Sequence, residues 1–198
     1  MKIETERLLI IKINMDMAEA VHKNSLDEDN RWFVPDEAFY TIKEASDTIA
    51  YLMEQYDTLS GPLVYAIIIK QTGENIGYVQ IIPFEDNHWE IGYHIAKPYV
   101  GNGYASEAVN AFLPVITKKI GIDEVYGVCL KNNLASNSVM TKCGFTNIFN
   151  GDGNYQGELR PIIKNVWRKF WFYQFPVLQK LFNRFIFFHE RGCKHNIL

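Results

Sequence analysis

Two glycines stand just ahead of a predicted helix, in the segment "KPYVGNGYASEAV" at residues 97–109. The helix opens at Tyr104, where the first amides have no partner inside the helix and the helix dipole places partial positive charge. Gly101 and Gly103 would let a phosphate approach those amides closely. A hydrogen bond to a charged group contributes roughly 1.5–3 kcal/mol, so several amides could hold a pyrophosphate without any Lys or Arg. The segment therefore predicts an anion site, although turns before helices also contain glycine for backbone reasons alone.

Two familiar nucleotide motifs do not fit this segment. No GK[ST] follows the glycines, which excludes a P-loop. The spacing Gly101-x-Gly103-x-x-Ser106 lacks the third glycine of the dinucleotide fingerprint and follows an antiparallel region. ATP and NAD are therefore disfavoured as ligands.

The hydrophobic pattern predicts the elements that must position this loop. In chain order we expect a strand (3–13), two helices (16–26 and 41–56), a hairpin (63–70 and 75–84), a strand (88–96), a helix (103–121), a strand (122–130), a short helix (134–144) and two strands (145–151 and 158–170). The second helix is the clearest, because Thr41 and Glu44 form a capping box. A helix between the fourth and fifth strands requires a parallel crossover, so the class is mixed α/β with an antiparallel first half.

Length and composition indicate one domain with an appendage. The chain has 198 residues, 47% of them hydrophobic and 22% charged, which is ordinary for a folded globular protein. The charged start "MKIETERLLI" argues against a secretory signal, so we expect a cytoplasmic protein. Cys129, Cys143 and Cys193 form no CxxC pair, so neither a disulfide framework nor a metal site is expected. Residues 161–198 are basic and the rest is acidic, which disfavours nucleic acid as a partner.

Three segments together resemble one protein family. "TERLLI", "EIGYHIAKPYVGNGYASEAV" and "NNLASNSVMTKCGF" are similar to the GNAT acyltransferase superfamily, in particular to its ribosomal-protein N-terminal acetyltransferases, over about residues 5–168. In that family the pattern [QR]xxGx[GA] supplies backbone amides to the pyrophosphate of acetyl-CoA. Gly103 and Ala105 match its last two positions, whereas Val100 replaces the Gln or Arg. A second motif, NxxS followed by KxGF, is matched by residues Asn133, Ser136, Lys142, Gly144 and Phe145.

The resemblance implies an α/β fold with a mixed, largely antiparallel seven-stranded sheet flanked by helices. Its central parallel strands splay apart, and pantetheine inserts between them. Acetyl-CoA would then be held by the backbone near Ile95, by the loop and by the start of the short helix. The implied cofactor-binding residues are Ile95, Val100, Gly101, Asn102, Gly103, Tyr104, Ala105, Ser106, Asn133 and Ser136. Residues 1–169 would form the acetyltransferase domain and residues 170–198 a basic aromatic tail.

Direct acetyl transfer needs a neutral amine, donors for the carbonyl oxyanion and a proton for the departing thiolate. The candidate bases are Glu90 and His94, which strand alternation puts on one face. Glu90 could instead be a solvated strand-end carboxylate, and His94 a packed polar residue. An α-amino group, with a pKa of about 7.7–8.0, is neutral far more often at physiological pH than a lysine near 10.4.

The acid is less well defined by the sequence. Many GNAT enzymes carry a tyrosine four residues before the glycine of KxGF, but Met140 stands there. Ser136 is the candidate that the resembling subgroup suggests, with Tyr155 second, and Ser136 could also be an ordinary helix N-terminal serine. Cys129 could be an acyl-carrying nucleophile or a small buried thiol.

The predicted function is transfer of an acetyl group from acetyl-CoA to a primary amine, either a protein N-terminus or a small amine. The alternatives are a non-catalytic acyl-CoA-binding module and a membrane adaptor led by the tail. Acceptor contacts are expected from Trp32, Phe33, Tyr155 and Arg160. The sequence of the tail predicts an amphipathic helix. This helix could dock on its own domain, dock on a second subunit to form a homodimer, or contact a membrane surface.

Overall fold

The computed structural model describes residues 1–84 and 88–169, and Met1–Arg168 form one compact unit. The predicted tail lies outside the described residues. The helices are α1 (Ala18–Ser25), α2 (Glu28–Phe33), α3 (Ile42–Thr58), α4 (Tyr104–Ile120) and α5 (Leu134–Lys142), with short 3-10 turns η1 (Met15–Met17), η2 (Pro35–Glu37) and η4 (Lys97–Tyr99). The strands are β1 (Lys2–Glu4), β2 (Leu8–Lys12), β3 (Leu63–Ile69), β4 (Asn75–Pro83), β5 (Trp89–Ile95), β6 (Glu124–Leu130), β7 (Thr146–Tyr155) and β8 (Glu158–Arg168).

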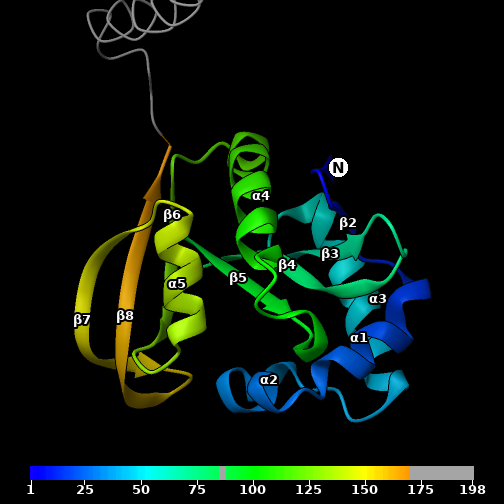
Figure 1. Cartoon of the computed structure of the whole chain (residues 1–198), viewed down its shortest axis with the longest axis horizontal. Coiled ribbons are helices and arrows are strands. Elements are labelled where there is room, and N and C mark those ends of the chain that lie inside the picture. Colours follow the sequence, from blue (N-terminus) through cyan, green and yellow to red (C-terminus); the bar gives the residue numbers. More distant parts are fainter. Residues whose placement is uncertain (85–87, 170–198) are drawn as a thin grey trace, which may run out of the picture. The chain divides into compact units, whose positions relative to one another are not determined.

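Within the described residues the strands form one sheet in the order β1-β2-β3-β4-β5-β6-β8-β7. Every neighbouring pair is antiparallel except β5 and β6, which are parallel and are joined by the crossover helix α4 (Figure 1). The mixed, largely antiparallel sheet that the sequence predicts is confirmed. The parallel pair is where the predicted anion loop lies, since the loop follows β5 and precedes α4.

The sheet has one strand more than expected, because the segment at residues 3–13 is two paired strands and not one. The Thr5 hydroxyl oxygen accepts a bond from the Leu8 amide at 2.8 Å, and the Thr5 amide donates to the Leu8 carbonyl at 2.9 Å. These two bonds close a tight turn between β1 and β2. The apolar run alone does not show this turn, because it depends on one threonine side chain.

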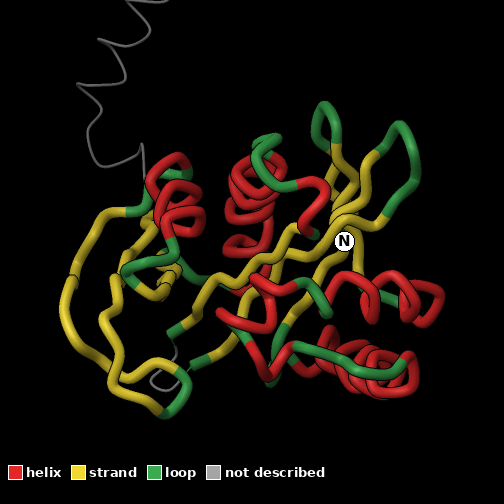
Figure 2. The backbone as a smooth tube through the Cα atoms, turned by 60° about the horizontal axis from the view of Figure 1, so that its bottom comes forward, coloured by secondary structure: helices red, strands yellow, loops and turns green. Residues whose placement is uncertain are grey.

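Helices cover both faces of the sheet (Figure 2). α4 fills one face with its buried side chains Ala108, Val109, Phe112, Leu113 and Ile116. The Phe112 ring lies 5.3 Å from the ring of Tyr65 on β3, so the crossover helix packs directly on the central strands. Pro114 lies inside a continuous α4.

α3 begins as the sequence predicts, because Thr41 and Glu44 form the complete capping box. α2 was not predicted, because it is a six-residue helix in a polar segment without helical periodicity. The predicted end of β7, at residue 151, was too early. The strand continues to Tyr155 and turns at Gln156 and Gly157, which both have positive φ. No helix in the described residues is long and apolar enough to cross a membrane.

Candidate active site

The two parallel strands β5 and β6 separate almost as soon as they meet. Their ladder has a single paired position, Glu90 opposite Tyr126, and β5 then runs away from β6 (Figure 1). A cavity of about 1120 Å³ is lined by both strands and by the first turns of α4 and α5. α5 approaches closely at Gly127, where a Cβ atom would lie 3.0 Å from the sulfur of Met140. The cavity thus runs through the splayed sheet.

The predicted anion loop lies at one end of this cavity. Gly101 and Gly103 have φ values of +82° and +80°, in the left-handed region that favours glycine. The Glu107 amide makes the first helical bond, to the Gly103 carbonyl at 3.0 Å, so the amides of residues 104–106 precede the helical ladder. Ala105 and Ser106 line the cavity. The loop therefore offers several amides at the mouth of the opening.

Asn102 and Val100 of this loop have different contacts. The Asn102 side chain turns back to its own loop and donates to the carbonyls of Tyr99, at 3.1 Å, and Val100, at 3.3 Å. Val100, where the family carries Gln or Arg, is half exposed and lines the cavity. Asn102 thus stabilises the loop, while Val100 offers the cavity an apolar surface.

The N-terminal segment contacts this loop and holds it in place. The sequence alone did not predict this contact. Arg7 donates to the Asn102 carbonyl at 3.0 Å and to the Glu107 carboxylate at 2.7 Å, and its guanidinium lies over the ring of Tyr104. The Thr5 hydroxyl also donates to Glu107, at 2.5 Å. Partial burial acts to raise the pKa of Glu107, but the bonds from Thr5 and Arg7 and the Arg7 charge outweigh it and lower the pKa. Glu107 is therefore an ionised anchor for the "TERLLI" segment.

We expect Arg7→Ala to weaken acetyl-CoA binding about tenfold while kcat stays nearly unchanged. The substitution removes the bond to the Asn102 carbonyl and lets the loop move, and a loss of about 1.4 kcal/mol corresponds to a factor of ten. Calorimetry with acetyl-CoA measures the change. Arg160→Ala is the matched control, because Arg160 also bonds a carboxylate at 2.7 Å, that of Glu158. Equal affinities for the two variants would remove Arg7 from this role.

The start of α5 also lines the cavity. Asn133 caps the helix by accepting from the Ser136 amide at 3.0 Å, and both residues line the cavity. The Tyr93 hydroxyl of β5 lies 2.8 Å from the Ser136 hydroxyl. Met140 is buried and accepts a bond from Asn165 at 3.1 Å, so the position that carries a tyrosine in many family members belongs to the core here.

Cys129 is a buried thiol beside Ser136 and Asn137. Burial raises its pKa to about 11, with a bond from Ser136 acting in the other direction. Its sulfur lies 3.4 Å from the Asn137 side-chain oxygen. A thiol with this pKa is almost entirely protonated at neutral pH, which favours the small buried thiol over the nucleophile.

Glu90 and His94 lie on the same face of β5 and both line the cavity. Burial raises the pKa of Glu90 to about 7, while a bond from the Val128 amide and the charge of Lys164 act to lower it. Glu90 is therefore partly buried and is not a solvated strand-end carboxylate. The His94 ring lies 3.6 Å from the carboxylate of Asp27, which also accepts from the Lys97 amide at 2.6 Å. Glu90 is thus a carboxyl group poised to exchange a proton near neutral pH.

A second carboxyl group, Glu37 of η2, was missed by the sequence analysis. Its oxygens accept from the Tyr78 hydroxyl and from the Gln80 side-chain amide, the latter at 3.0 Å. Burial raises its pKa to about 7. All three residues line the same cavity as Glu90. The only sequence signal is Gln80, a polar residue in an apolar strand.

Comparison with known proteins identifies the family of this chain. Residues 7–146 match the acetyltransferase (GNAT) domain. The chain belongs to the GNAT acetyltransferase family. It is 30% identical to N-acetyltransferase YoaA of Bacillus subtilis strain 168 over 146 residues, which are 72% of this chain and 81% of that protein. The predicted family and enzyme class are confirmed, and acetyl-CoA is the donor that this family uses.

Solved structures show the same fold. A GNAT acetyltransferase of Bacillus anthracis superposes with a TM-score of 0.73 at 24% identity, over 85% of this chain and 98% of that one. The ribosomal alpha-N-protein acetyltransferase RimL, in complex with coenzyme A, superposes with a TM-score of 0.74 at 17% identity, over the same shares. These structures show the fold, while the family match and the relative YoaA support an N-acetyltransferase and do not favour a non-catalytic acyl-CoA-binding module.

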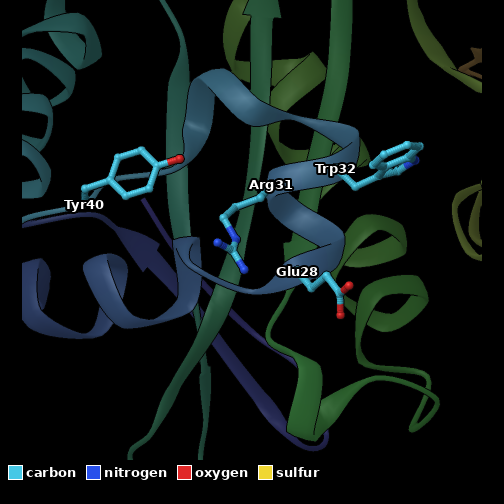
Figure 3. Close-up of a pocket in the computed structure, with 4 residues that line it drawn as sticks. All are labelled: Glu28, Arg31, Trp32 and Tyr40. Carbon is cyan, nitrogen blue, oxygen red and sulfur yellow. The ribbon is translucent and has the colours of Figure 1, made fainter.

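The structure of this acetyltransferase separates the four residues expected to contact the acceptor. Phe33 and Tyr155 line the cavity, and the Tyr155 hydroxyl donates to the Phe33 carbonyl at 3.1 Å, which joins the β7–β8 hairpin to α2. Trp32 is exposed and borders a separate hollow of about 410 Å³, with Glu28, Arg31 and Tyr40. Figure 3 shows Trp32 pointing away from Tyr40 there. Arg160 pairs with Glu158 on the hairpin.

Proposed function

We propose that this acetyltransferase acetylates a primary amine by direct attack on acetyl-CoA bound across the splayed strands. The observation that carries the proposal is the continuity of the cavity, which runs from the loop amides through the gap between β5 and β6 to Glu90. A pyrophosphate fits the loop end, because free amides and glycines lie there. Pantetheine is an extended chain with amide groups, so it can pair with strand backbone at the gap.

The cofactor would contact ten residues in this proposal. The backbone near Ile95 pairs with pantetheine, residues 101–106 hold the pyrophosphate, and Val100 packs against the cofactor. Asn133 and Ser136 lie at the thiol end. Asn102 acts through its carbonyl and side chain, which hold the loop together. The assignment is supported by the cavity lining, which includes the other nine residues.

Glu90 serves as the general base in this proposal, and His94 is the second candidate. A base is most effective when its pKa lies near the working pH, and burial raises the pKa of Glu90 to about 7. Ser136, at the start of α5, is the first acid candidate, because its hydroxyl lines the cavity. Tyr155 remains the second acid candidate, and burial raises its pKa to about 12.

Three carboxyl groups of the cavity, those of Asp27, Glu37 and Glu90, favour a cationic acceptor. Glu37 and Glu90 carry their charge above about pH 7, and a carboxylate attracts an ammonium group more strongly where water is partly excluded. A protein N-terminus or a small amine meets this requirement. RimL, a fold neighbour, carries the name of an alpha-N-protein acetyltransferase, which makes an N-terminal α-amine the first candidate.

We expect Glu37→Gln to raise the KM for the amine roughly tenfold while the KM for acetyl-CoA stays within twofold. The substitution keeps the size of the side chain and a hydrogen-bond acceptor but removes its charge, which is worth on the order of 1 kcal/mol in a partly screened cavity. Steady-state kinetics with each substrate varied in turn give both constants. Glu158→Gln, on the exposed end of β8, is the control. An unchanged amine KM would exclude Glu37 from acceptor binding.

The amine is identified by a panel of peptides, polyamines and aminoglycosides, with free CoA measured as the product. Turnover of at least one class supports the proposal. Tight acetyl-CoA binding with no turnover on any amine would instead favour the acyl-CoA-binding module.

We further propose a cytoplasmic enzyme with an acetyltransferase domain over residues 1–169 and a separate tail at 170–198. Homodimer formation or membrane-surface contact would depend on the tail. Deleting the tail and measuring both liposome binding and acetyl-CoA affinity tests this. Loss of liposome binding with retained affinity supports a separate role.

A further inference from the structure

We propose that Tyr93 orients the Ser136 hydroxyl toward the departing thiolate and so replaces the phenol that is absent at position 140. The inference rests on the proposed function, because it assigns the thiol end of acetyl-CoA to the start of α5. It concerns a positioning residue that no sequence motif indicates.

The geometry joins two elements on either side of the cavity. Tyr93 lies on β5 and Ser136 on α5, and both line the opening. The phenol oxygen lies 2.8 Å from the Ser136 hydroxyl oxygen and 3.1 Å from the Ser136 carbonyl oxygen. The Asn133 cap holds the Ser136 amide at 3.0 Å, so the backbone of this serine is held as well as its side chain.

The number of hydroxyl hydrogens on Tyr93 and Ser136 determines which hydrogen bonds the two residues can make. A phenol has one hydrogen, and Tyr93 has two acceptors on Ser136 within reach. When Tyr93 donates to the Ser136 hydroxyl oxygen, the serine hydrogen can point either into the cavity or toward the Cys129 sulfur, which Ser136 also contacts. When Tyr93 donates to the carbonyl, the serine hydrogen is directed back to the phenol. The first arrangement provides a donor for an anion at the thiol end.

Tyr93 acts as a donor and not as a proton source. Burial raises its pKa above the usual value, even though a bond from Ser136 acts in the other direction, so the phenol stays protonated. In the reaction the carbon–sulfur bond breaks and its electron pair stays on sulfur, where the Ser136 hydrogen bond stabilises it. The proton that sulfur finally takes is the one that the amine nitrogen loses as the amide forms. Atoms and charge then balance without any added reagent.

Position 140 carries no hydroxyl in this chain. Met140 follows Ser136 by one helical turn and lines the same cavity, with its sulfur against Gly127 and Asn165. The strand residue Tyr93 brings a phenol to the same helix from β5.

The test is Tyr93→Phe, which keeps the ring and removes the hydroxyl. With acetyl-CoA we expect kcat to fall about tenfold and the acetyl-CoA KM to stay within twofold. With the acetyl thioester of 4-nitrothiophenol, whose thiolate is a far better leaving group, the loss in kcat/KM should shrink to less than twofold. A merely structural role would reduce both rates equally, and that result would overturn the proposal.

Two further variants complete the test. Ser136→Ala should show the same dependence on the leaving group, and the double variant should be no worse than Ser136→Ala alone, because the two hydroxyls act as a unit. Additive losses would contradict this. Tyr56→Phe is the control, since Tyr56 is a buried phenol that bonds backbone within the core. It should lose stability without any dependence on the leaving group.

The result can be separated from failure of the proposed function. If the unaltered protein transfers acetyl groups to no amine, the function itself is wrong. If it does so and Tyr93→Phe keeps full activity, only this inference is wrong. Should Tyr93→Phe not fold, replacing Tyr93 with a fluorinated tyrosine keeps its size. This replacement should change kcat with acetyl-CoA and leave the aryl thioester rate unchanged, and no change with either donor would overturn the inference.

Discussion

Gly103→Val should raise the dissociation constant for acetyl-CoA at least a hundredfold. Gly103 has a φ of +80° at the N-terminal cap of α4, and a side chain in this conformation costs roughly 1–2 kcal/mol, with a β-branched residue at the high end. The chain would relieve this strain by turning the loop, which moves the amides away from the pyrophosphate. Losing two amide bonds to a charged group, at roughly 1.5–3 kcal/mol each, corresponds to about 10² to 10⁴ in affinity.

Gly73→Val is the matched control for this prediction. Gly73 has a φ of +76° in the turn between β3 and β4, and nothing lies within 4 Å of the position of its Cβ. The two variants carry the same backbone strain, so thermal unfolding should show similar losses of stability. Calorimetry should then show normal acetyl-CoA affinity for Gly73→Val alone. If both variants bind acetyl-CoA normally, the loop amides are not the pyrophosphate site.

Glu90→Gln should lower kcat/KM about 100- to 1,000-fold at pH 8 and at the same time stabilise the fold. The loss follows from the contribution of a positioned base, which is typically 10² to 10⁴. A base with a pKa of about 7 gives a rate that rises with pH through that value, because only the carboxylate accepts a proton. The variant should lose this rise and keep only the one near pH 8 that comes from deprotonation of the amine, and pH–rate profiles of the two proteins with one amine measure the difference.

The gain in stability follows from the sign of the same shift. The pKa of Glu90 is raised from 4.5 to about 7 in the folded protein. Protonated Glu90 therefore contributes to the free energy of unfolding, and this contribution is complete below pH 4.5. It is lost as the pH rises to about 7, because the folded protein then holds a poorly solvated carboxylate. Glutamine removes that charge. We expect a gain of up to about 3 kcal/mol at pH 8, and almost none at pH 4.5.

Denaturant unfolding at the two pH values checks this second effect. Glu37→Gln is the comparison, because burial also raises the pKa of Glu37 to about 7. It should share the gain in stability at pH 8 but keep its kcat. An unaltered pH–rate profile in Glu90→Gln would assign the base to another group, with His94 as the next candidate.

The parts of the site that the sequence predicted depend on local signals. Glycines before a helix, the capping box at Thr41 and the alternation that puts Glu90 and His94 on one face are all properties of a few adjacent residues. Each constrains the backbone within one or two turns, so a single sequence contains enough information to place it.

The contacts that the sequence did not predict join distant residues. Arg7 reaches Glu107 and Asn102, Glu37 reaches Tyr78 and Gln80, and Tyr93 reaches Ser136. No periodicity records which polar side chain meets which across a sheet, because that depends on how the helices pack. The split of β1 from β2 has the same origin in one side-chain bond of Thr5.

The single paired position between β5 and β6 has a consequence for the cooperativity of the whole domain. Strands β1–β5 form one hydrogen-bonded ladder and β6–β8 another, and Glu90 opposite Tyr126 is the one rung recorded between them in the described residues. The two ladders are therefore held together mainly by side chains of the shared core, and their facing edges can loosen at a lower free energy than the whole domain. A coenzyme that pairs with both edges would fuse them, and at a hundred times its Kd it would add about 2.7 kcal/mol to the unfolding free energy. The donor substrate would then act as a removable strand of the protein.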